Sequence, residues 1–434
     1  MTARDGSSSG ERHDEGSRTL APFRYPAFRA IWIANLASNL GTAIQSVAAA
    51  WLMTELTASH LLIALVQSSA TLPILMLGMF AGAIADNYDR RRVMLAAQTG
   101  MLAVSAGLAV TTALGLITPV MLLMFTLALG TGTALNAPAW QASVRLQVGL
   151  RDVPQAIALN SIAFNLARSV GPAIGGLLIS LTSPALAFAI NSASFVAMIV
   201  VLARWRPEMP RREKRRMLPA IAIGIRYCMQ SSPIRRVLLR GLALGFGMAA
   251  YQALIPSIVH DGLGGDELDY GLILGLFGAG SICAALALGA VRRRFGVENV
   301  LAGGTATFVM ALWVLGATRA LAWALPVSFI AGLGWVSILT SLNVAMQIRS
   351  PEEILGRCLS LYQAVTFGAM ALGAWIWGSM ADWRGLPFAL HAASAFLALS
   401  LGLRFVAPMP LPGEGRPASD ARETGTDDAN TPPP

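Results

Sequence analysis

The chain has 434 residues, of which 55% are hydrophobic and only 13% are charged. A soluble protein carries about a quarter charged residues, so this composition excludes an array of soluble domains and indicates a chain that folds in lipid. The net charge of +9 does not indicate a nucleic-acid partner, because the basic residues form short clusters between long apolar runs and not one basic face.

Twelve segments are long and apolar enough to be membrane-spanning helices, each of which needs about 20 apolar residues. In chain order these segments are 27–53, 61–85, 93–115, 118–143, 153–181, 185–203, 234–259, 268–291, 299–318, 321–346, 355–381 and 386–406. The flanking residues 1–24 and 408–434 are polar and are expected to be disordered tails. The predicted fold is therefore an all-α membrane protein with twelve transmembrane helices.

The short connections between these segments alternate in charge. Arginine clusters follow even-numbered segments, as at 90–92, 204–216 and 292–294, whereas the connection after the seventh segment, 260–269, is acidic. Since positively charged loops stay in the cytoplasm, both termini are expected there. The chain is thus predicted to be a multi-pass protein of the cell membrane, and we expect this to be the bacterial cytoplasmic membrane.

Residues 204–217 divide the chain into two stretches that repeat each other. The matched positions are Pro26 with Pro233, Gly82 with Gly289 and Asn136 with Asn343, each offset by 207, and Gly171 with Gly373, offset by 202. Chance similarity between apolar helices is the alternative, but equal offsets at such landmarks argue against it. We therefore expect two pseudo-symmetric six-helix halves, 25–204 and 233–407, joined by a cytoplasmic linker at 205–232 that contains an amphipathic segment. Transporters built from such repeats bind substrate near the midplane, where the repeats meet.

The first predicted helix carries polar side chains at spacings of three and four. They are Asn35, Ser38, Asn39, Thr42, Gln45 and Ser46. This spacing predicts one helical stripe, and amides that faced lipid would lack partners, at a cost of several kcal/mol each. The stripe is therefore expected to face a water-filled cavity, with polar contacts between helices as the alternative.

The fifth predicted helix contains an arginine, Arg168, within the sequence NLARSVGPAIGG. It lies about 15 residues, or roughly 22 Å, from the cytoplasmic end, at a depth where a charge costs about 2.5–3.5 kcal/mol. No Asp or Glu lies deep in any predicted span, so we expect the guanidinium to meet an amide, a backbone carbonyl or an anionic group of a substrate. A purely structural arginine bonded to carbonyls is the alternative. The Gly-Pro run at 171–176 is expected to let this helix bend and approach a partner closely.

The stretch GAIADNYDRRR at 82–92 resembles the cytoplasmic signature of the major facilitator superfamily, G-x-L-A-D-R-x-G-R-R. The positions that fit are Gly82, Ile84, Ala85, Asp86, Arg90 and Arg91, whereas Asn87 and Asp89 depart from the pattern. GPAIGG at 171–176 is similar to the fifth-helix signature of the superfamily's antiporters. The residues from 136 to 176 and LSLYQAV at 359–365 resemble the branch of secretion effectors that includes enterobactin exporters.

This resemblance extends over roughly residues 20–407 and implies the major facilitator fold and export, with no particular substrate. It also implies that Asp86 packs near the start of the eleventh helix, 351–357, in a latch that breaks when the cytoplasmic side opens. Many drug–proton antiporters of the superfamily have an arginine in the fourth helix, near the point where this chain has Thr126. Coupling to a proton is therefore left open.

From these arguments we predict a secondary active exporter of small organic molecules, siderophore-like or drug-like, that works by alternating access. An importer of a small metabolite is the alternative. A membrane-embedded enzyme or receptor is a remote alternative, because no deep carboxylate pair and no sizeable soluble domain supports it. We expect a monomer in the lipid bilayer with no cofactor and no metal, since the chain lacks a phosphate-binding loop and its histidines lack metal-ligand spacing.

The predicted functional residues form two sets. The substrate-cavity set is Asn35, Asn39, Thr42, Gln45, Asn136, Trp140, Gln141, Ser161, Asn165, Arg168, Asn343, Gln347, Tyr362 and Gln363. The gating set is Gly82, Asp86, Arg90, Arg91, Gly171, Pro172, Gly175 and Gly176.

Overall fold

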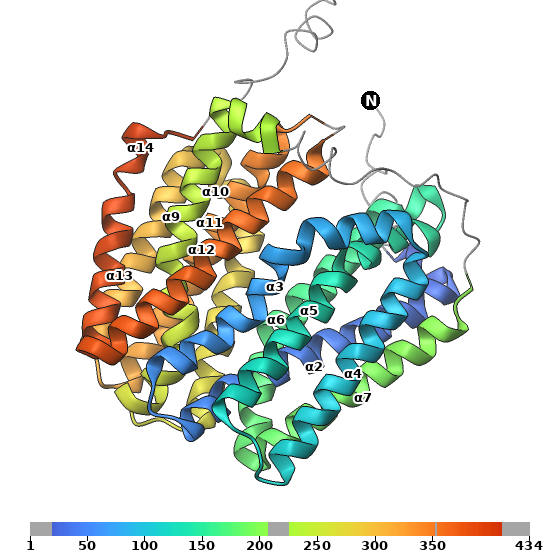
Figure 1. Cartoon of the computed structure of the whole chain (residues 1–434). Coiled ribbons are helices and arrows are strands. Elements are labelled where there is room, and N and C mark those ends of the chain that lie inside the picture. The colour runs from blue at the N-terminus through green and yellow to red at the C-terminus, as the bar shows by residue number, and fades with distance from the viewer. Residues whose placement is uncertain (1–19, 207–224, 352–353, 410–434) are drawn as a thin grey trace, which may run out of the picture.

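The structure is a computed structural model that describes residues 20–206, 225–351 and 354–409 (Figure 1). All regular elements in these ranges are helices. Most of the predicted tails and of the predicted linker lie outside the described residues.

The helices of the first half begin at recognisable local signals. They are α2 (Pro26–Leu56), α3 (His60–Asn87), α4 (Arg90–Ala113), α5 (Pro119–Ser143), α6 (Val153–Leu181) and α7 (Pro184–Arg204). Proline stands in the first turn of α2, α5, α6 and α7, where its missing amide loses no hydrogen bond. Ser59, Thr118 and Ser183 precede α3, α5 and α7, and each side chain accepts a hydrogen bond from a first-turn amide. The predicted spans agree with these helices to within a few residues.

The second half contains α9 (Ser232–Ser257), α10 (Glu267–Ala317), α11 (Leu321–Arg349), α12 (Leu355–Arg384), α13 (Leu386–Ser400) and the short α14 (Leu403–Val406). A π-helical turn, Ile258–Gly262, follows α9. The predicted last span, 386–406, is therefore interrupted after Ser400.

The long helix α10 is two membrane spans. At Gly296 the backbone has φ 76° and ψ 161°, a conformation that favours glycine. On α11, Gly332 packs against Phe277, and Gly334 packs against Gly304, whereas one straight helix would separate positions 277 and 304 by about 40 Å. The chain therefore folds back at Gly296. The connection between the eighth and ninth spans is shorter than predicted, because the polar residues around Gly296 are helical.

Ten helices in the described ranges are long and apolar enough to cross a membrane, with α10 counted once. The reversal at Gly296 makes α10 two spans. The twelfth span is the 31-residue helix α2, which is not among the ten because its polar stripe lowers its hydropathy. The predicted all-α membrane fold with twelve transmembrane helices is confirmed.

The twelve spans form two six-helix bundles, one coloured blue to green and the other yellow-green to red (Figure 1). The bundles meet mainly through two pairs of helices, α3 with α12 and α6 with α10. Equivalent glycines show the repeat: Gly171 of α6 packs on Ala43 of α2, and Gly373 of α12 packs on Ala249 of α9. The second and fifth helices of one half thus meet the fifth and second of the other, as the predicted pseudo-symmetry requires.

Successive helices run in opposite directions, so the connections gather at two ends of the molecule. We call the end that carries the start of α2 at Pro26 and the end of α7 at Arg204 the terminal end. The opposite end, where α2 stops at Leu56 and α3 begins at His60, is the distal end.

A buried ion pair fastens the second half near the terminal end. Arg240 of α9 is 5% exposed, and its guanidinium donates to Glu298 at 2.7 Å and to the carbonyl of Ala407 at 2.9 Å. Glu298 also accepts a hydrogen bond from the amide of Met409 at 2.7 Å. The pair joins positions 58 residues apart and was not predicted. Such a pair holds the chain after α14 against the bundle, because the buried guanidinium of Arg240 would lack a charged partner without Glu298.

Candidate functional site

One face of α6 carries polar side chains along the line where the two halves meet. Ser161, Asn165 and Arg168 are exposed on this face. The hydroxyl of Ser161 donates to the carbonyl of Ile157 at 3.0 Å, and the amide of Asn165 donates to the carbonyl of Ser161 at 2.9 Å. Both side chains therefore have a partner in their own helix and still remain accessible, as residues that line an aqueous passage would be.

Arg168 is directed toward the second half. Its guanidinium carbon lies 5.9 Å from the ring centre of Trp335 on α11 and 5.8 Å from that of Phe164 on its own helix. At these distances a cation is attracted to an aromatic ring. Among the described residues, no acidic side chain forms an ion pair with Arg168. Its guanidinium can therefore still donate to a carbonyl or an anion.

Trp335 belongs to an aromatic cluster inside the second half. It is 5% exposed, and its ring centre lies 5.8 Å from that of Phe277 and 6.3 Å from that of Phe308. Tyr251 stacks on Phe277 at 5.1 Å. This packing fixes Trp335 beside Arg168, so the two halves contact each other where the exposed part of the α6 face ends.

Beyond Arg168, the same face of α6 is packed against α10. The hydroxyl of Ser169 donates to the carbonyl of Gly278 at 3.3 Å. About one turn further on, Ala173 packs on Gly275, and about two turns further on, Gly176 packs on Gly271. Small residues let two helices approach this closely. The face is therefore closed in its distal half and accessible in its terminal half.

The seam between α3 and α12 changes in the same way along its length. In the distal half, Ser68 donates to the carbonyl of Ala371 at 2.9 Å, and near the middle of both helices Leu75 packs on Gly368. Toward the terminal end, a Cβ placed at Gly82 or at Gly356 would meet no atom within 4 Å. In the part of the chain that the structure describes, both seams are thus closed at the distal end and open toward the terminal end.

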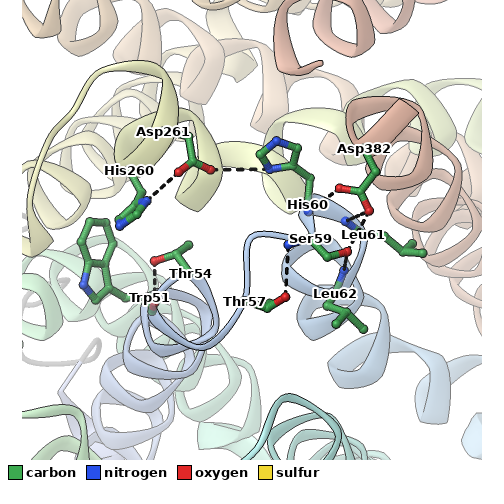
Figure 2. Close-up of polar contacts among 10 residues, drawn as sticks. All are labelled: Trp51, Thr54, Thr57, Ser59, His60, Leu61, Leu62, His260, Asp261 and Asp382. Atoms are coloured by element: carbon green, nitrogen blue, oxygen red, sulfur yellow. Dashed lines mark hydrogen bonds and ion pairs between the residues drawn. The ribbon is translucent and has the colours of Figure 1, made fainter. Parts of the chain in front are cut away.

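A carboxylate of the second half caps the start of α3 at the distal end (Figure 2). Asp382, near the end of α12, accepts hydrogen bonds from the hydroxyl of Ser59 at 2.7 Å and from the amides of His60 at 2.6 Å and Leu61 at 3.2 Å. An anion at a helix start binds amides that have no partner within the helix and opposes the positive end of the helix dipole. Asp382 thus joins the two halves on the closed side.

The predicted polar stripe on α2 is two stripes. Gln45 is 5% exposed, and its side-chain oxygen accepts hydrogen bonds from Ser105 of α4 at 2.7 Å and from Asn191 of α7 at 2.6 Å. For Gln45 the cavity prediction is corrected, because its amide connects three helices of one half; Ser38 is buried on the same side. The other members, Asn35, Asn39, Thr42 and Ser46, lie on a neighbouring line of the helix and are half-buried or exposed.

The predicted substrate-cavity residues on α5, α11 and α12 also divide into residues packed within one half and residues that are at least partly accessible. Trp140 packs against a hydrophobic cluster of the first half. Tyr362 is 4% exposed, with its hydroxyl 3.4 Å from the carbonyl of Leu339. Both positions therefore correspond to packing within one half. The half-buried or exposed members are Asn136, Gln141, Asn343, Gln347 and Gln363, and Gln347 donates to Asn343 along α11.

The predicted gating arginines fasten the first half in this state. Arg90 donates to the carbonyl of Ala142 in the last turn of α5 at 2.7 Å. Arg91 donates to the carbonyls of Leu202 and Ala203 in the last turn of α7, at 2.8 Å each. Cations at these positions satisfy carbonyls that the helix leaves without partners. Near them, Gly82 lies on the open part of its seam, and the side chain of Asp86 lies outside the described residues.

The predicted gating residues of α6 serve two different contacts. Gly171 and Gly175 pack on α2 within the first half. Gly176 faces α10 of the other half, and the carbonyl of Pro172 lies on the same side, near Gly271. Only the latter contacts would have to break if the halves separated at the distal end.

Two parts of this arrangement were not predicted. Trp335 is one of many apolar residues in its span, and no sequence signal singles it out. Asp382 follows directly after the predicted eleventh span, and His60 directly precedes the second. Charged and polar residues at span ends are a weak signal, because interfacial anchors also lie there.

Comparison with known proteins assigns the chain to a family. The family model described as transmembrane secretion effector matches residues 17–423. An enterobactin exporter, EntS, of Shigella boydii serotype 4 (strain Sb227) is 26% identical over 387 residues, which are 87% of this chain and 91% of that protein. The enterobactin exporter EntS of Escherichia coli O1:K1 / APEC is 27% identical over 394 residues, with the same coverage.

Solved transporter structures share the fold at low sequence identity. The nucleoside transporter NupG superposes with a TM-score of 0.67 at 11% identity, covering 88% of this chain and 99% of that one. A bacterial homolog of the human lysosomal transporter Spinster, in an inward-facing and unoccupied conformation, gives a TM-score of 0.69 at 14% identity, covering 89% and 97%. The resemblance seen in the signature at 82–92 is thus confirmed, and the chain belongs to the transmembrane secretion effector family of major facilitator transporters.

Proposed function

We propose that the protein exports small organic anions by secondary active transport, with Arg168 as the residue that attracts the substrate. The observation that carries this proposal is the accessible face of α6, where Arg168 lies near two aromatic rings and forms no ion pair with a described acidic residue. A planar guanidinium binds two oxygens of a carboxylate or catecholate at once, and the rings can stack on an aromatic substrate. The similarity to enterobactin exporters supports the direction of transport.

The proposed passage combines accessible polar residues of both halves. Ser161, Asn165 and Arg168 supply the α6 side. The further proposed lining residues are Asn35, Asn39, Thr42, Asn136, Gln141, Asn343, Gln347 and Gln363. A substrate would reach Arg168 from the terminal end in the present state and would leave after the distal contacts of α6 with α10 and of α3 with α12 had opened.

We also propose that the terminal end is cytoplasmic, so that the present state faces inward. The arginine clusters gather at that end, and the acidic connection after α9 lies at the distal end. Single cysteines at Lys214 and at Ala320 in a cysteine-free background provide the test. We expect an impermeant thiol reagent to label intact cells only at Ala320, with both positions labelled after permeabilisation. Labelling of intact cells at Lys214 would overturn the orientation.

The function is tested with everted membrane vesicles, whose interior corresponds to the outside of the cell. Energised vesicles that contain the protein are expected to accumulate a labelled dihydroxybenzoate or a related organic anion, and to accumulate its neutral methyl ester much less. Vesicles without the protein give the background. Equal accumulation of ester and anion would contradict a preference for anions. Uptake by right-side-out vesicles with none by everted ones would instead identify an importer.

A further inference from the structure

A chain of titratable side chains connects the two halves at the closed distal end. His60 is the first residue of α3, in the first half, while His260 and Asp261 lie in the π-helical turn after α9, in the second half. Figure 2 shows Asp261 between the two imidazole rings. One of its carboxylate oxygens lies 2.7 Å from Nδ1 of His260, and the other lies 3.6 Å from Nδ1 of His60. A proton on His60 therefore creates an ion pair between the halves.

The contacts of His60 leave this nitrogen available. Nδ1 of His60 is buried and makes no hydrogen bond, while the backbone amide of the same residue donates to Asp382 at 2.6 Å. Both carboxylates near His60 thus belong to the second half. The charged ring attracts them, and the neutral ring does not, so the strength of the contact between the halves depends on protonation.

The other charged groups near the cluster come from α2, α10 and the connection after α10. Glu55, near the end of α2, interacts electrostatically with Glu267 at the start of α10 and with His260. Since Glu55 and Glu267 belong to opposite halves, their repulsion opposes closure when both are ionised. Asp266 and Asp269 adjoin Glu267, and Arg319 lines the same surface hollow as His60 and Asp261.

We propose that His60, Asp261 and His260 form a proton-sensitive latch that holds the distal end closed in acid. At low pH the imidazoles are charged, and the contact between His60 and Asp261 holds the halves together. As the pH rises and the imidazoles lose their protons, the rings become neutral and the attraction is lost. Protonation of Glu55 or Glu267 at low pH would remove the repulsion between them. This change would also favour the closed distal end in acid.

This latch regulates transport and does not carry a coupling proton. All its members lie at the distal end, so their protons exchange with the same side of the membrane in both states. A coupling site must instead be reached from each side in turn. With the orientation proposed above, an acidic exterior would slow the release of substrate. The inference needs only the distal contacts and is independent of which substrate is exported.

The test measures distal opening directly, without substrate, in nanodiscs where both faces have the same pH. Spin labels at Ala58 and Ala320, two exposed positions in opposite halves, report the distance across the distal end after the three native cysteines are replaced by serine. We expect the ratio of open to closed molecules to fall by up to about fivefold between pH 8 and pH 5.5, which is the upper end for a surface ion pair. His60→Gln and Asp261→Asn should each remove most of this response.

The matched control is His391→Gln, because His391 contacts Trp313 within the second half and not the latch. It should keep the full pH response. A latch variant should match the parent protein at pH 8 and differ from it only in acid. A parent protein with no pH response would overturn the proposal. A His60→Gln variant that is more open than the parent protein by the same factor at both pH values would do so as well, since its pH response would then be intact and the change would be a packing defect.

Discussion

Replacing Arg168 with lysine is expected to lower export of carboxylate- or catecholate-bearing compounds by about tenfold or more, with no loss of folded protein. Lysine keeps the charge but cannot bind two oxygens in one plane or lie flat against an aromatic ring as arginine does. The ring centres of Phe164 and Trp335, 5.8 and 5.9 Å from the guanidinium carbon, hold that planar geometry in place. A tenfold loss corresponds to about 1.4 kcal/mol of lost interaction. The measurement is the initial rate of accumulation in everted vesicles, divided by the amount of folded transporter.

Arg168→Ala extends the same test to the charge itself. It should abolish transport of anions, while the amount of folded protein holds or rises, because a charge at this depth costs about 2.5–3.5 kcal/mol on insertion. The matched control is Arg384→Ala, which removes an arginine beside two other rings, Trp383 and Phe388, at the distal end. If Arg168 were purely structural, transport of anions and of neutral esters would fall together, in step with the folded protein.

A side chain at Gly176 is expected to prevent the distal end from closing. A Cβ at this position would lie 2.5 Å from the Cα of Gly271 and 2.7 Å from the carbonyl oxygen of Glu267. Both atoms belong to the backbone of α10, which cannot move aside as a flexible side chain can. Overpacking of this kind costs about 1–3 kcal/mol, which would shift the balance between closed and open states by about 5- to 150-fold. Gly176→Val should therefore lengthen the distance between labels at Ala58 and Ala320 and strongly slow transport.

The clash in Gly176→Val lies between the halves and not inside one, so the variant should still fold. Gly303→Ala is the control, because a Cβ at this helical position would meet no atom within 4 Å. It should close and transport like the parent protein. A Gly176→Val protein with the parent distance distribution would show that the seam between α6 and α10 does not need this close approach.

Hydropathy predicted the helices well because each must cross the same apolar layer. The span predicted at 153–181 coincides with α6. The connection before Gly296 was predicted less well. Arginines mark the end of a membrane span, but arginine is also a good helix former, so the helix continues through them. They therefore mark the membrane surface without marking where the helix stops.

Sequence predicted the part of the candidate site where a single residue has an unusual free-energy cost in the membrane. It missed the parts that depend on a contact between residues distant in the chain. The depth of Arg168 is visible in the sequence, since a charge in an apolar run needs an explanation. Its neighbour Trp335 is visible only in three dimensions. Gln45 was misassigned because a polar residue on a membrane helix satisfies the same pattern whether it faces water or another amide. The contact between His60 and Asp382 joins residues 322 positions apart, beyond the reach of any local pattern.

The glycine contact between α6 and α10 also determines how the bilayer can act on the protein. A seam of small residues gains little from the hydrophobic effect inside a membrane, because acyl chains are as apolar as the groups they would replace. Separating Gly176 from Gly271 therefore exchanges packing between helices for packing against lipid. The quality of that lipid packing depends on how ordered the acyl chains are. The same transporter would accordingly switch at different rates in fluid and in ordered membranes.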